Sequence, residues 1–385
     1  MEIKRWLSKL SFKGDKVILG LVAFLTLLSI LLVYSTGGRR VLSHLIHLVF
    51  CYAGLTFFYM VSYKKVLDKG AFMGLLFALI LVLLTLTSRA VRGITFLGHD
   101  IQTFYLIGFL VIMFIANFIG RRYNKGTGLS DHDMIYLNGL LLFFCGCIAV
   151  LNMSTAIILF VTGVVIYFVG GFTMKRLLRV CGIVVLVVGV LAFAVWKTGG
   201  EGKQIGRMST FVNRLEYYFT KENVNGYGDQ MILARSAIAR SGLHPAGPGK
   251  GVIKNRLPEN ATDYAYASLF EETGLLLGLV VLMAYMVIFY RAWKISKAST
   301  NPLGSILAFG IGFWFTSQAL VHIGVNCELL PTTGQTLPFI SSGGASLFVS
   351  GCAMGMLLNV SKKNVDDADY EDPKQMFYRS RLNEE

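Results

Sequence analysis

The chain has 385 residues, of which 54% are hydrophobic and only 15% are charged, and its formal net charge is +14. A soluble domain usually has about 25% charged residues, and the mean hydropathy here is +0.60. There is not enough charge to cover a water-facing surface. The composition excludes a disordered chain, a secreted disulfide scaffold and an ordinary cytosolic enzyme, and it indicates a polytopic helical membrane protein.

The positive net charge and the six cysteines both have simple explanations in a membrane protein. Lys and Arg collect on the cytoplasmic side of such proteins, so we expect no nucleic-acid partner. Five of the cysteines lie in apolar runs, and the pair Cys145-x-Cys147 lacks both the spacing of a zinc site and a nearby His. We interpret the cysteines as small apolar packing residues.

The apolar stretches predict an all-α protein with ten transmembrane helices, because a span needs about 20 mostly apolar residues. The first stretch follows a basic segment, 1–16, as the core of a signal peptide would. It is long enough to span, however, and no clear small-x-small cleavage site follows it, so we expect an uncleaved helix. The expected spans are 17–34, 44–62, 71–87, 102–120, 134–151, 154–170, 180–196, 264–290, 303–326 and 341–360.

The distribution of Lys and Arg predicts that both termini lie in the cytoplasm. With that orientation the inner segments hold 22 basic residues, the short outer loops hold 4, and 10 lie in one long outer loop, where the rule is weak. The expected organisation is a cytoplasmic N-tail over 1–16, a membrane domain over 17–360 and a solvated cytoplasmic C-tail over 361–385.

The long extracytoplasmic loop between the seventh and eighth spans, 197–262, is the natural place for chemistry, because long loops on a rigid frame tend to carry function. Two stretches in it are typical of amphipathic helices: 211–219, and a segment that starts at Asp229 and ends before Gly242. The next segment, 242–251, is rich in Gly and Pro and is either a connector or a binding loop. The loop is net positive, which suits an anionic headgroup such as a pyrophosphate, or anionic lipid in general.

Three carboxylates stand near the start of the eighth span, whose first turns are expected above the membrane because the apolar run is too long for the bilayer. Asp263 is expected in the first turn, where a negative charge is favourable without any function. Glu271 and Glu272 follow two turns later. Carboxylates this close to hydrocarbon are functional or paired by default. The bases that one of them could neutralise are Lys254, Arg256 and Arg240.

The segment 326–346 contains two prolines, three glycines and many hydroxyls, so it cannot form regular helix before the tenth span. Irregular backbone at membrane depth is tolerated only when it is buried in protein or lines a wet cavity. We therefore expect this segment to form a wall of a substrate groove. Glu328 has no basic neighbour within it, so its partner must come from elsewhere in the chain.

Two motifs in these segments resemble the SEDS family of bacterial peptidoglycan glycosyltransferases, which includes FtsW and RodA. The first is Leu257-Pro258-Glu259 followed by Thr262-Asp263-Tyr264 and Glu271-Glu272-x-Gly274. The second is Leu330-Pro-Thr-Thr-Gly334-Gln335-Thr-Leu337-Pro338-Phe339-x-Ser341-x-Gly343-Gly344-x-Ser346-Leu347. The resemblance covers nearly the whole chain, including Ser154-Thr155-Ala156 at the sixth span. Lys254 and Gln335 make it closer to FtsW, the septal enzyme, than to RodA.

One part of the family pattern is altered here. Across the second outer loop and fourth span the family usually has Gly-Ala-x-Arg-Trp, then Gln-Pro-Ser-Glu and a Lys. In this chain Arg92 and Gln102 match, but Gly93 replaces the Trp, Thr103-Phe104-Tyr105 replace Pro-Ser-Glu, and no Lys follows. The change leaves open a divergent or less active member, or a compensating charge from Arg89, Arg92 or Asp100.

The resemblance implies polymerisation of lipid II, in which a sugar hydroxyl of one chain displaces undecaprenyl pyrophosphate from another. The donor is α-linked and the product β-linked, so a single inverting displacement needs one general base. The resemblance assigns this carboxylate to Asp263, whose strength as a base burial would increase. Alternatively, Asp263 holds a divalent cation such as Mg or Mn on the pyrophosphate; no other cofactor is expected.

The residues expected to bind substrate come from the long loop and the two motifs. The basic ones would meet the leaving-group charge together with backbone N–H groups of 242–251. The full set of expected substrate-binding residues is Lys254, Arg256, Glu259, Arg207, Arg240, Glu271, Gln335, Ser341, Gly343 and Gly344.

By resemblance, we expect the chain in the bacterial inner membrane at the division septum. Its expected partners are membrane lipid, a class B penicillin-binding protein packed on the eighth and ninth spans, and other division proteins. RodA-like elongation, a lipid II flippase and a non-catalytic scaffold for a transpeptidase stay open as alternatives. A flippase needs a polar path, and the mid-span candidate, His322, is more often a packed histidine. The altered fourth span keeps the scaffold open, whereas the intact Asp263 argues against it.

Overall fold

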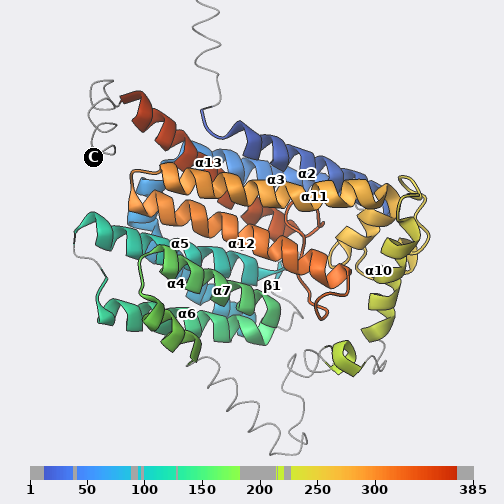
Figure 1. Ribbon diagram of the computed structural model, residues 1–385, viewed down its shortest axis with the longest axis horizontal. Helices are drawn as coiled ribbons and strands as arrows, with labels where there is room; N and C mark the ends of the chain where they lie inside the picture. The colour runs from blue at the N-terminus through green and yellow to red at the C-terminus, as the bar shows by residue number, and fades with distance from the viewer. Residues whose placement is uncertain are drawn as a thin grey trace, which may run out of the picture.

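Long apolar helices lie side by side in the computed structural model (Figure 1), which describes residues 13–37, 41–87, 94–96, 99–126, 129–182, 214, 216–220 and 227–370. The long helices are α2 (Lys16–Ser35), α3 (Val41–Met60), α4 (Tyr63–Thr87), α5 (Thr103–Asn124), α6 (Asp131–Leu151), α7 (Met153–Val169), α11 (Ala265–Ala298), α12 (Pro302–Asn326) and α13 (Gly344–Tyr370). The smaller elements are the strands β1 (Ile94–Phe96) and β2 (His99–Ile101), the helix α10 (Tyr227–Ser241) and a 3-10 turn, η2 (Lys254–Arg256).

Eight of the described helices are long and apolar enough to cross a membrane, and α7 is apolar but shorter. Each of them matches one of the expected spans. The seventh expected span, 180–196, lies outside the described residues after 182. The full number of spans and the orientation in the membrane therefore stay predictions, while the multi-helical membrane architecture is confirmed.

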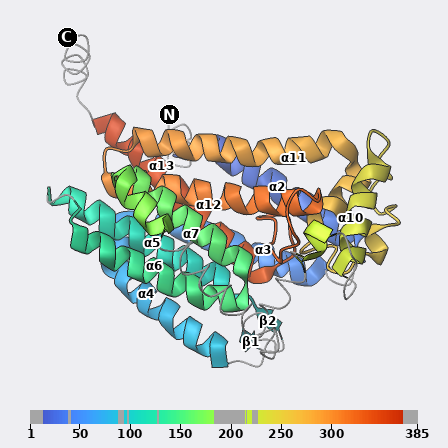
Figure 2. The same cartoon turned by 60° about the horizontal axis from the view of Figure 1, so that its bottom comes forward.

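The burial of each helix separates a central layer from a peripheral one. In the most apolar windows of α5 and α13, 83% of residues are buried, against 28% in α3, α4 and α6. In Figures 1 and 2, α12 and α5 lie between α11 on one side and α4 on the other. The peripheral helices direct apolar side chains outward, such as Phe50 of α3 and Phe72 of α4, as lipid-facing helices do.

Helices α3 and α13 approach closely because glycines stand where they cross. A Cβ at Gly351 or Gly355 of α13 would collide with the backbone carbonyl of Cys51 or Leu55 of α3. Small residues at such positions let two membrane helices pack through dispersion contacts along their backbones. This packing holds the start of α13, and with it the second motif, against the bundle.

Helix α11 is broken rather than continuous, which the hydropathy of 264–290 did not predict. Gly274 has φ 77° and ψ −176°, a conformation essentially restricted to glycine, so 265–273 form a short separate helix. The N–H of Leu275, freed by the break, donates to the carbonyl of Gly242 at 2.9 Å. The long loop thus caps the interruption, and Asp263 precedes the helix instead of lying in its first turn.

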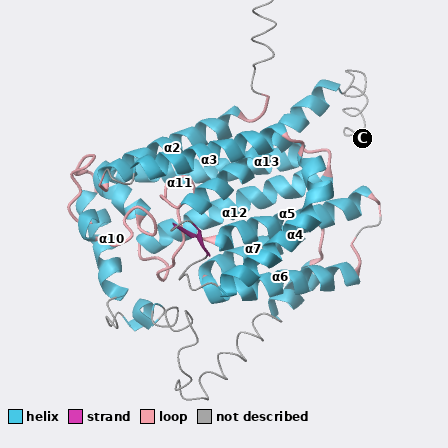
Figure 3. Ribbon diagram, turned by 180° about the vertical axis from the view of Figure 1, so that it is seen from behind, coloured by secondary structure: helices cyan, strands magenta, loops and turns pink. Residues whose placement is uncertain are grey.

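Three other details differ from the sequence expectations. Strands β1 and β2 pair as an antiparallel hairpin where no strand was expected. Helix α10 begins at Tyr227, two residues before Asp229, and the first loop helix is described only at 214 and 216–220. Helix α13 continues to Tyr370, so the expected C-tail at 361–385 begins as helix. Figure 3 shows the hairpin and much of the irregular backbone near the end of the bundle that carries α10.

Candidate active site

The two sequence motifs meet at the end of the bundle near α10. Ser341 Oγ donates to the carbonyl of Thr262 at 2.7 Å, and the N–H of Ser342 donates to the carbonyl of Ala261 at 2.8 Å. Ser341 is fully buried, and its Oγ also accepts the N–H of Leu337 at 2.8 Å. The turn that carries Asp263 is therefore hydrogen-bonded directly to the segment that leads into α13.

Asp263 is held in a tight turn immediately before α11 and is only 7% exposed. The turn starts at Glu259, whose φ is 55° and whose carbonyl accepts the N–H of Tyr264 at 3.1 Å. The carbonyl of Asp263 accepts Nδ2 of Asn326, at the end of α12, at 3.2 Å. Asn326 Oδ1 accepts the N–H of Ala267 at 3.0 Å. Asn326 of α12 thus joins the carbonyl of Asp263 to the first turn of α11, and the position of Asp263 near a helix N-terminus favours a negative charge.

The carboxylates of Glu271 and Glu272 organise the Gly-rich segment of the long loop. Glu271 accepts three consecutive backbone N–H groups, at 252–254, with distances of 2.8–2.9 Å. Glu272 Oε1 accepts the N–H of Gly249 at 3.0 Å. The carbonyls of both glutamates accept N–H groups of Ala246 and Gly247 at 3.0 Å. The N–H groups of Ala246, Gly247 and Gly249 lie in the segment 242–251 that was expected to assist a leaving group, and here they donate to Glu271 and Glu272.

Lys254 forms a buried ion pair with Glu272, and both side chains are 0% exposed. Lys254 Nζ also donates to the carbonyl of Ser35, the last residue of α2, at 2.7 Å. The interpretation that a glutamate neutralises Lys254 is confirmed. The expected substrate contacts of Lys254 and Glu271 find no support in this geometry, because both residues are buried and their hydrogen bonds fold the loop.

Gln335 lies in a buried uncharged cluster between α5, α7 and the irregular segment. Its Nε2 donates to Oγ1 of Thr155 at 2.5 Å, and Oε1 is 3.5 Å from the hydroxyl of Tyr105. Its carbonyl is 2.8 Å from Nδ1 of His322, so His322 is a packed histidine bonded to backbone. Gln335 is 1% exposed. Its hydrogen bonds fix the irregular segment in place, as do those of Ser341.

The two glycines at the start of α13 allow a close approach of neighbouring segments. Gly343 and Gly344 are partly buried. A Cβ at Gly344 would lie 2.8 Å from Nε2 of His47 in α3, and one at Gly343 would lie 3.3 Å from Oγ of Ser346. The backbone at 343–344 is therefore packed closely against α3 and the first turn of α13.

A sequence model of the family described as cell cycle protein, FTSW_RODA_SPOVE, matches residues 11–366. The chain belongs to this family. It is 31% identical over 247 residues to the probable peptidoglycan glycosyltransferase FtsW of Dichelobacter nodosus, a match that covers 62% of this chain and 59% of that protein. It is 30% identical over 333 residues to the protein of the same name from Francisella salina, covering 83% of this chain and 78% of the relative.

The fold of this FtsW/RodA/SpoVE family member is also similar to a solved structure of a peptidoglycan synthase complex that coordinates polymerization and crosslinking. The TM-score is 0.74 over 93% of this chain and 99% of the other, at 20% sequence identity. An identity this low supports the shared fold alone. The family match includes the long loop and both motifs, so the site described above lies within it.

The exposed charges of the site come from the long loop. Arg256 in η2, Glu259 in the turn and Arg240 at the end of α10 are exposed, while Arg207 lies outside the described residues. Glu259 Oε2 accepts the hydroxyl of Thr262 at 2.5 Å, which fixes the turn before Asp263. Of the predicted basic residues that the structure describes, Arg256 and Arg240 are exposed and could contact an anionic ligand.

Two further arginines near the site were not singled out in the sequence. Arg214 Nη1 donates to the carbonyl of Thr332 at 3.5 Å, so Arg214 contacts the irregular segment 326–346. Arg235 of α10 pairs with Glu328 at 3.2 Å, which confirms that the partner of Glu328 comes from another segment. Arg214 lies in the first loop helix and Arg235 in α10. The sequence showed that both helices are amphipathic, but it did not show which distant residues these arginines contact.

Within the part of the chain that the structure describes, no group of three or more His, Cys, Asp or Glu side chains could hold a metal ion. Asp263 could supply a single carboxylate. Mg²⁺ is commonly bound by one or two carboxylates together with substrate phosphates and water. A cation at this site would therefore take most of its ligands from the substrate.

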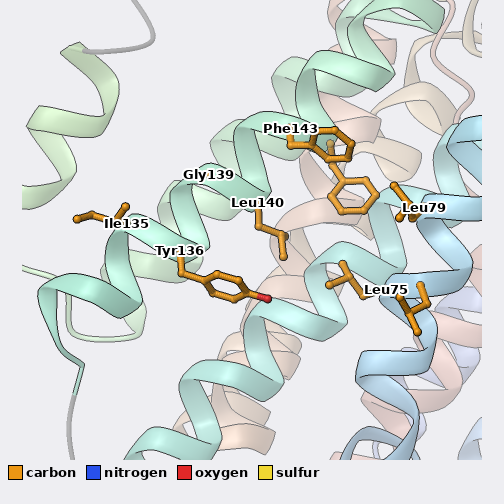
Figure 4. Close-up of a pocket in the computed structure, with 9 residues that line it drawn as sticks. Leu75, Leu79, Ile135, Tyr136, Gly139, Leu140 and Phe143 are labelled. Atoms are coloured by element: carbon orange, nitrogen blue, oxygen red, sulfur yellow. The ribbon is translucent and has the colours of Figure 1, made fainter.

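A separate apolar cavity of about 410 Å³ lies between α4 and α6 (Figure 4). Its lining includes Leu75 and Leu79 of α4, and Tyr136, Leu140 and Phe143 of α6. Neither helix carries any of the predicted site residues. The cavity is therefore distinct from the Asp263 turn.

Proposed function

We propose that this chain is a peptidoglycan glycosyltransferase that polymerises lipid II, with Asp263 as the carboxylate at the reacting centre. The observation that carries the proposal is the direct hydrogen bonding between the two family motifs, which places Asp263 in a buried, doubly anchored turn. The names of the two relatives, probable peptidoglycan glycosyltransferase FtsW, support the same activity.

In the proposed reaction, a hydroxyl oxygen of the acceptor sugar attacks the anomeric carbon of the donor. The new C–O bond forms as the bond to the pyrophosphate oxygen breaks, and the electron pair leaves with undecaprenyl pyrophosphate. The proton of the hydroxyl passes to the carboxylate of Asp263, which acts as general base. Hydrogen bonds from Ser341 and Asn326 hold the backbone carbonyls of Thr262 and Asp263, which keeps the turn that carries this carboxylate in place while the substrates change.

The negative charge on the leaving pyrophosphate requires cations at the outer surface of the site. Arg256 and Arg240 fit this role, since both are exposed residues of the long loop, and Arg207 stays a candidate. A divalent cation such as Mg or Mn held by Asp263 and the pyrophosphate would supply further neutralisation when bound. Lys254 takes no part in this proposal, because its charge is neutralised by Glu272.

We also propose that the protein acts at the division septum with a crosslinking partner, a class B penicillin-binding protein. The support is the similarity to FtsW proteins and to a synthase complex concerned with polymerization and crosslinking. RodA-like elongation would use the same chemistry at the same residues. It differs in partner and location, which cell imaging with each partner would distinguish.

The test is lipid II polymerisation by the purified full chain with its cognate transpeptidase and divalent cations supplied. We expect glycan strands from the wild type and none from Asp263→Asn, which keeps the size of the side chain but removes its basicity. Asp68→Asn is the matched control: Asp68 is an exposed carboxylate, 59% exposed, paired with Arg121 on other helices, so its loss should leave activity intact. Strands from Asp263→Asn at the wild-type rate would refute the role of Asp263. No strands from an intact wild-type complex would shift the weight to a scaffold or transport function.

A further inference from the structure

The hydroxyl of Tyr105 joins the start of α5 to the irregular segment through several hydrogen bonds. It accepts the backbone N–H of Thr336 at 2.8 Å and the hydroxyl of the same residue at 2.9 Å, and it lies 3.5 Å from Oε1 of Gln335. Tyr105 is 2% exposed, and Thr336 and Gln335 are each 1% exposed. All three residues are buried, so these hydrogen bonds satisfy polar groups that have little access to solvent.

Three consecutive residues of the irregular segment, 334–336, are held by three different helices. Asn152, which caps α7, donates through Nδ2 to the carbonyl of Gly334 at 3.2 Å. Gln335 bonds to Thr155 of α7 and, through its carbonyl, to His322 of α12. Tyr105 supplies the bonds from α5. Because this backbone has no helix or sheet to fix it, its position depends on these side chains.

The same segment leads without interruption to the Asp263 turn. Leu337, next to Thr336, donates its N–H to Ser341 Oγ at 2.8 Å, and Ser341 Oγ donates to the carbonyl of Thr262 at 2.7 Å. A shift of Thr336 would therefore move Leu337 and Ser341, and through them the residue beside Asp263. The path runs through uncharged groups from α5 to Thr262, the residue before the reacting carboxylate.

From this connection we infer that Tyr105 is a positioning residue for the transfer reaction: its hydroxyl sets the place of 335–337 and thereby the orientation of Asp263. The inference rests on the proposed function, since it concerns the same site. The neutral phenol of Tyr105 holds the backbone of Thr336 by a hydrogen bond, which needs no charged residue in α5.

The test compares Tyr105→Phe with Tyr167→Phe in the full chain with its transpeptidase. Tyr167 is an equally buried tyrosine whose hydroxyl donates to the carbonyl of Leu137 at 2.9 Å, between α7 and α6, away from the motifs. A displacement of about 1 Å at a reacting group can cost about 100-fold in rate, and one lost anchor among several should move it less. We therefore expect kcat to fall about 10-fold in Tyr105→Phe with KM changed less than about 2-fold, and kcat to be near wild type in Tyr167→Phe.

Two further measurements separate positioning from a general loss of structure. Hydrogen exchange at the Thr336 amide should become faster in Tyr105→Phe and stay unchanged in Tyr167→Phe. The kcat losses of Tyr105→Phe and Ser341→Ala should combine to less than their product, because both act through one connected segment. If Tyr105→Phe does not fold, Ser341→Ala breaks the same path at its other end and carries the same kcat expectation.

The outcomes are distinguishable. A lower kcat, faster exchange at Thr336 and non-additive double-variant rates support the inference. Wild-type kcat in folded Tyr105→Phe, or an equal loss in Tyr167→Phe, overturns it while leaving the proposed function standing. Absence of polymerisation by the wild type would overturn the proposed function and this inference together.

Discussion

Replacing Lys254 by Met should destabilise the long loop strongly, because it leaves a buried carboxylate without its counter-charge. Lys254 and Glu272 are both 0% exposed, and Lys254 Nζ also bonds to Ser35. Removing one partner of a buried ion pair costs about 3–5 kcal/mol, most of it the penalty of the remaining unpaired charge. Glu272 would keep the N–H of Gly249 as a hydrogen-bond donor, which compensates only in part.

The cost of Lys254→Met should appear first as local opening of 246–254, since these residues are held to α11 chiefly by Glu271 and Glu272. Hydrogen exchange of the loop amides measures the local opening, and thermal unfolding of the purified protein measures the loss of overall stability. Lys250→Met is the control: this lysine is exposed in the same loop, and the change should cost less than about 0.5 kcal/mol.

A double variant provides the decisive comparison. Lys254→Met combined with Glu272→Gln removes both charges, and neutral replacements of buried pairs are often close to neutral in stability. We expect the double variant to be more stable than Lys254→Met alone. A single variant within about 1 kcal/mol of wild type, or a double variant less stable than the single one, would refute the reasoning.

Other substitutions test different parts of the same frame. Glu271→Gln should cost about 1–3 kcal/mol, measured by thermal unfolding, because the amide replaces one carboxylate oxygen that accepts loop N–H groups by a donor. Gly274→Ala should cost about 1–3 kcal/mol in the same measurement, since a φ of 77° with a ψ of −176° is strained for any side chain; a wild-type melting curve would contradict the break in α11. Gly351→Val should lower the yield of folded protein by forcing α13 from α3, whereas the same change at Gly20, which has open space, should not. Arg235→Ala should change stability by less than about 1 kcal/mol, because Arg235 is 70% exposed and its pair with Glu328 is screened by water.

The helices could be predicted from the sequence because apolar length is what a membrane selects. The expected stretch 102–120 corresponds to α5, and 303–326 to α12, within a few residues. The break at Gly274 could not be predicted in this way. The sequence stays apolar on the C-terminal side of Gly274, so hydropathy does not mark the end of the short helix. The helix ends because Gly274 adopts non-helical dihedral angles and the N–H of Leu275 donates to the carbonyl of Gly242 in the loop.

The candidate site was predictable where a motif carries it and less so where pairing decides a role. The two motifs are hydrogen-bonded to each other through Ser341 and Thr262, next to Asp263, while the roles assigned to these residues by resemblance stay predictions. Lys254 and Arg256 were equivalent bases in the sequence, yet one is fully buried and the other exposed. Two residues of separation on a short 3-10 turn place them on different sides, and the adjacent carboxylate selects Lys254. Tyr105 stood out in the sequence only as a departure from the family pattern, and its contacts could not be predicted because Gln335 and Thr336 are distant in the sequence.

The contact between Lys254 and Ser35 has a consequence for how these positions can change in related chains. The ammonium bonds to the carbonyl of Ser35, which every amino acid provides, so position 35 is free to vary in identity. Positions 254 and 272 are not, since a charge at one without the other is buried alone. Among relatives that share this loop, we expect the lysine and the glutamate to be gained or lost together, while the residue at position 35, the last of α2, varies independently of both.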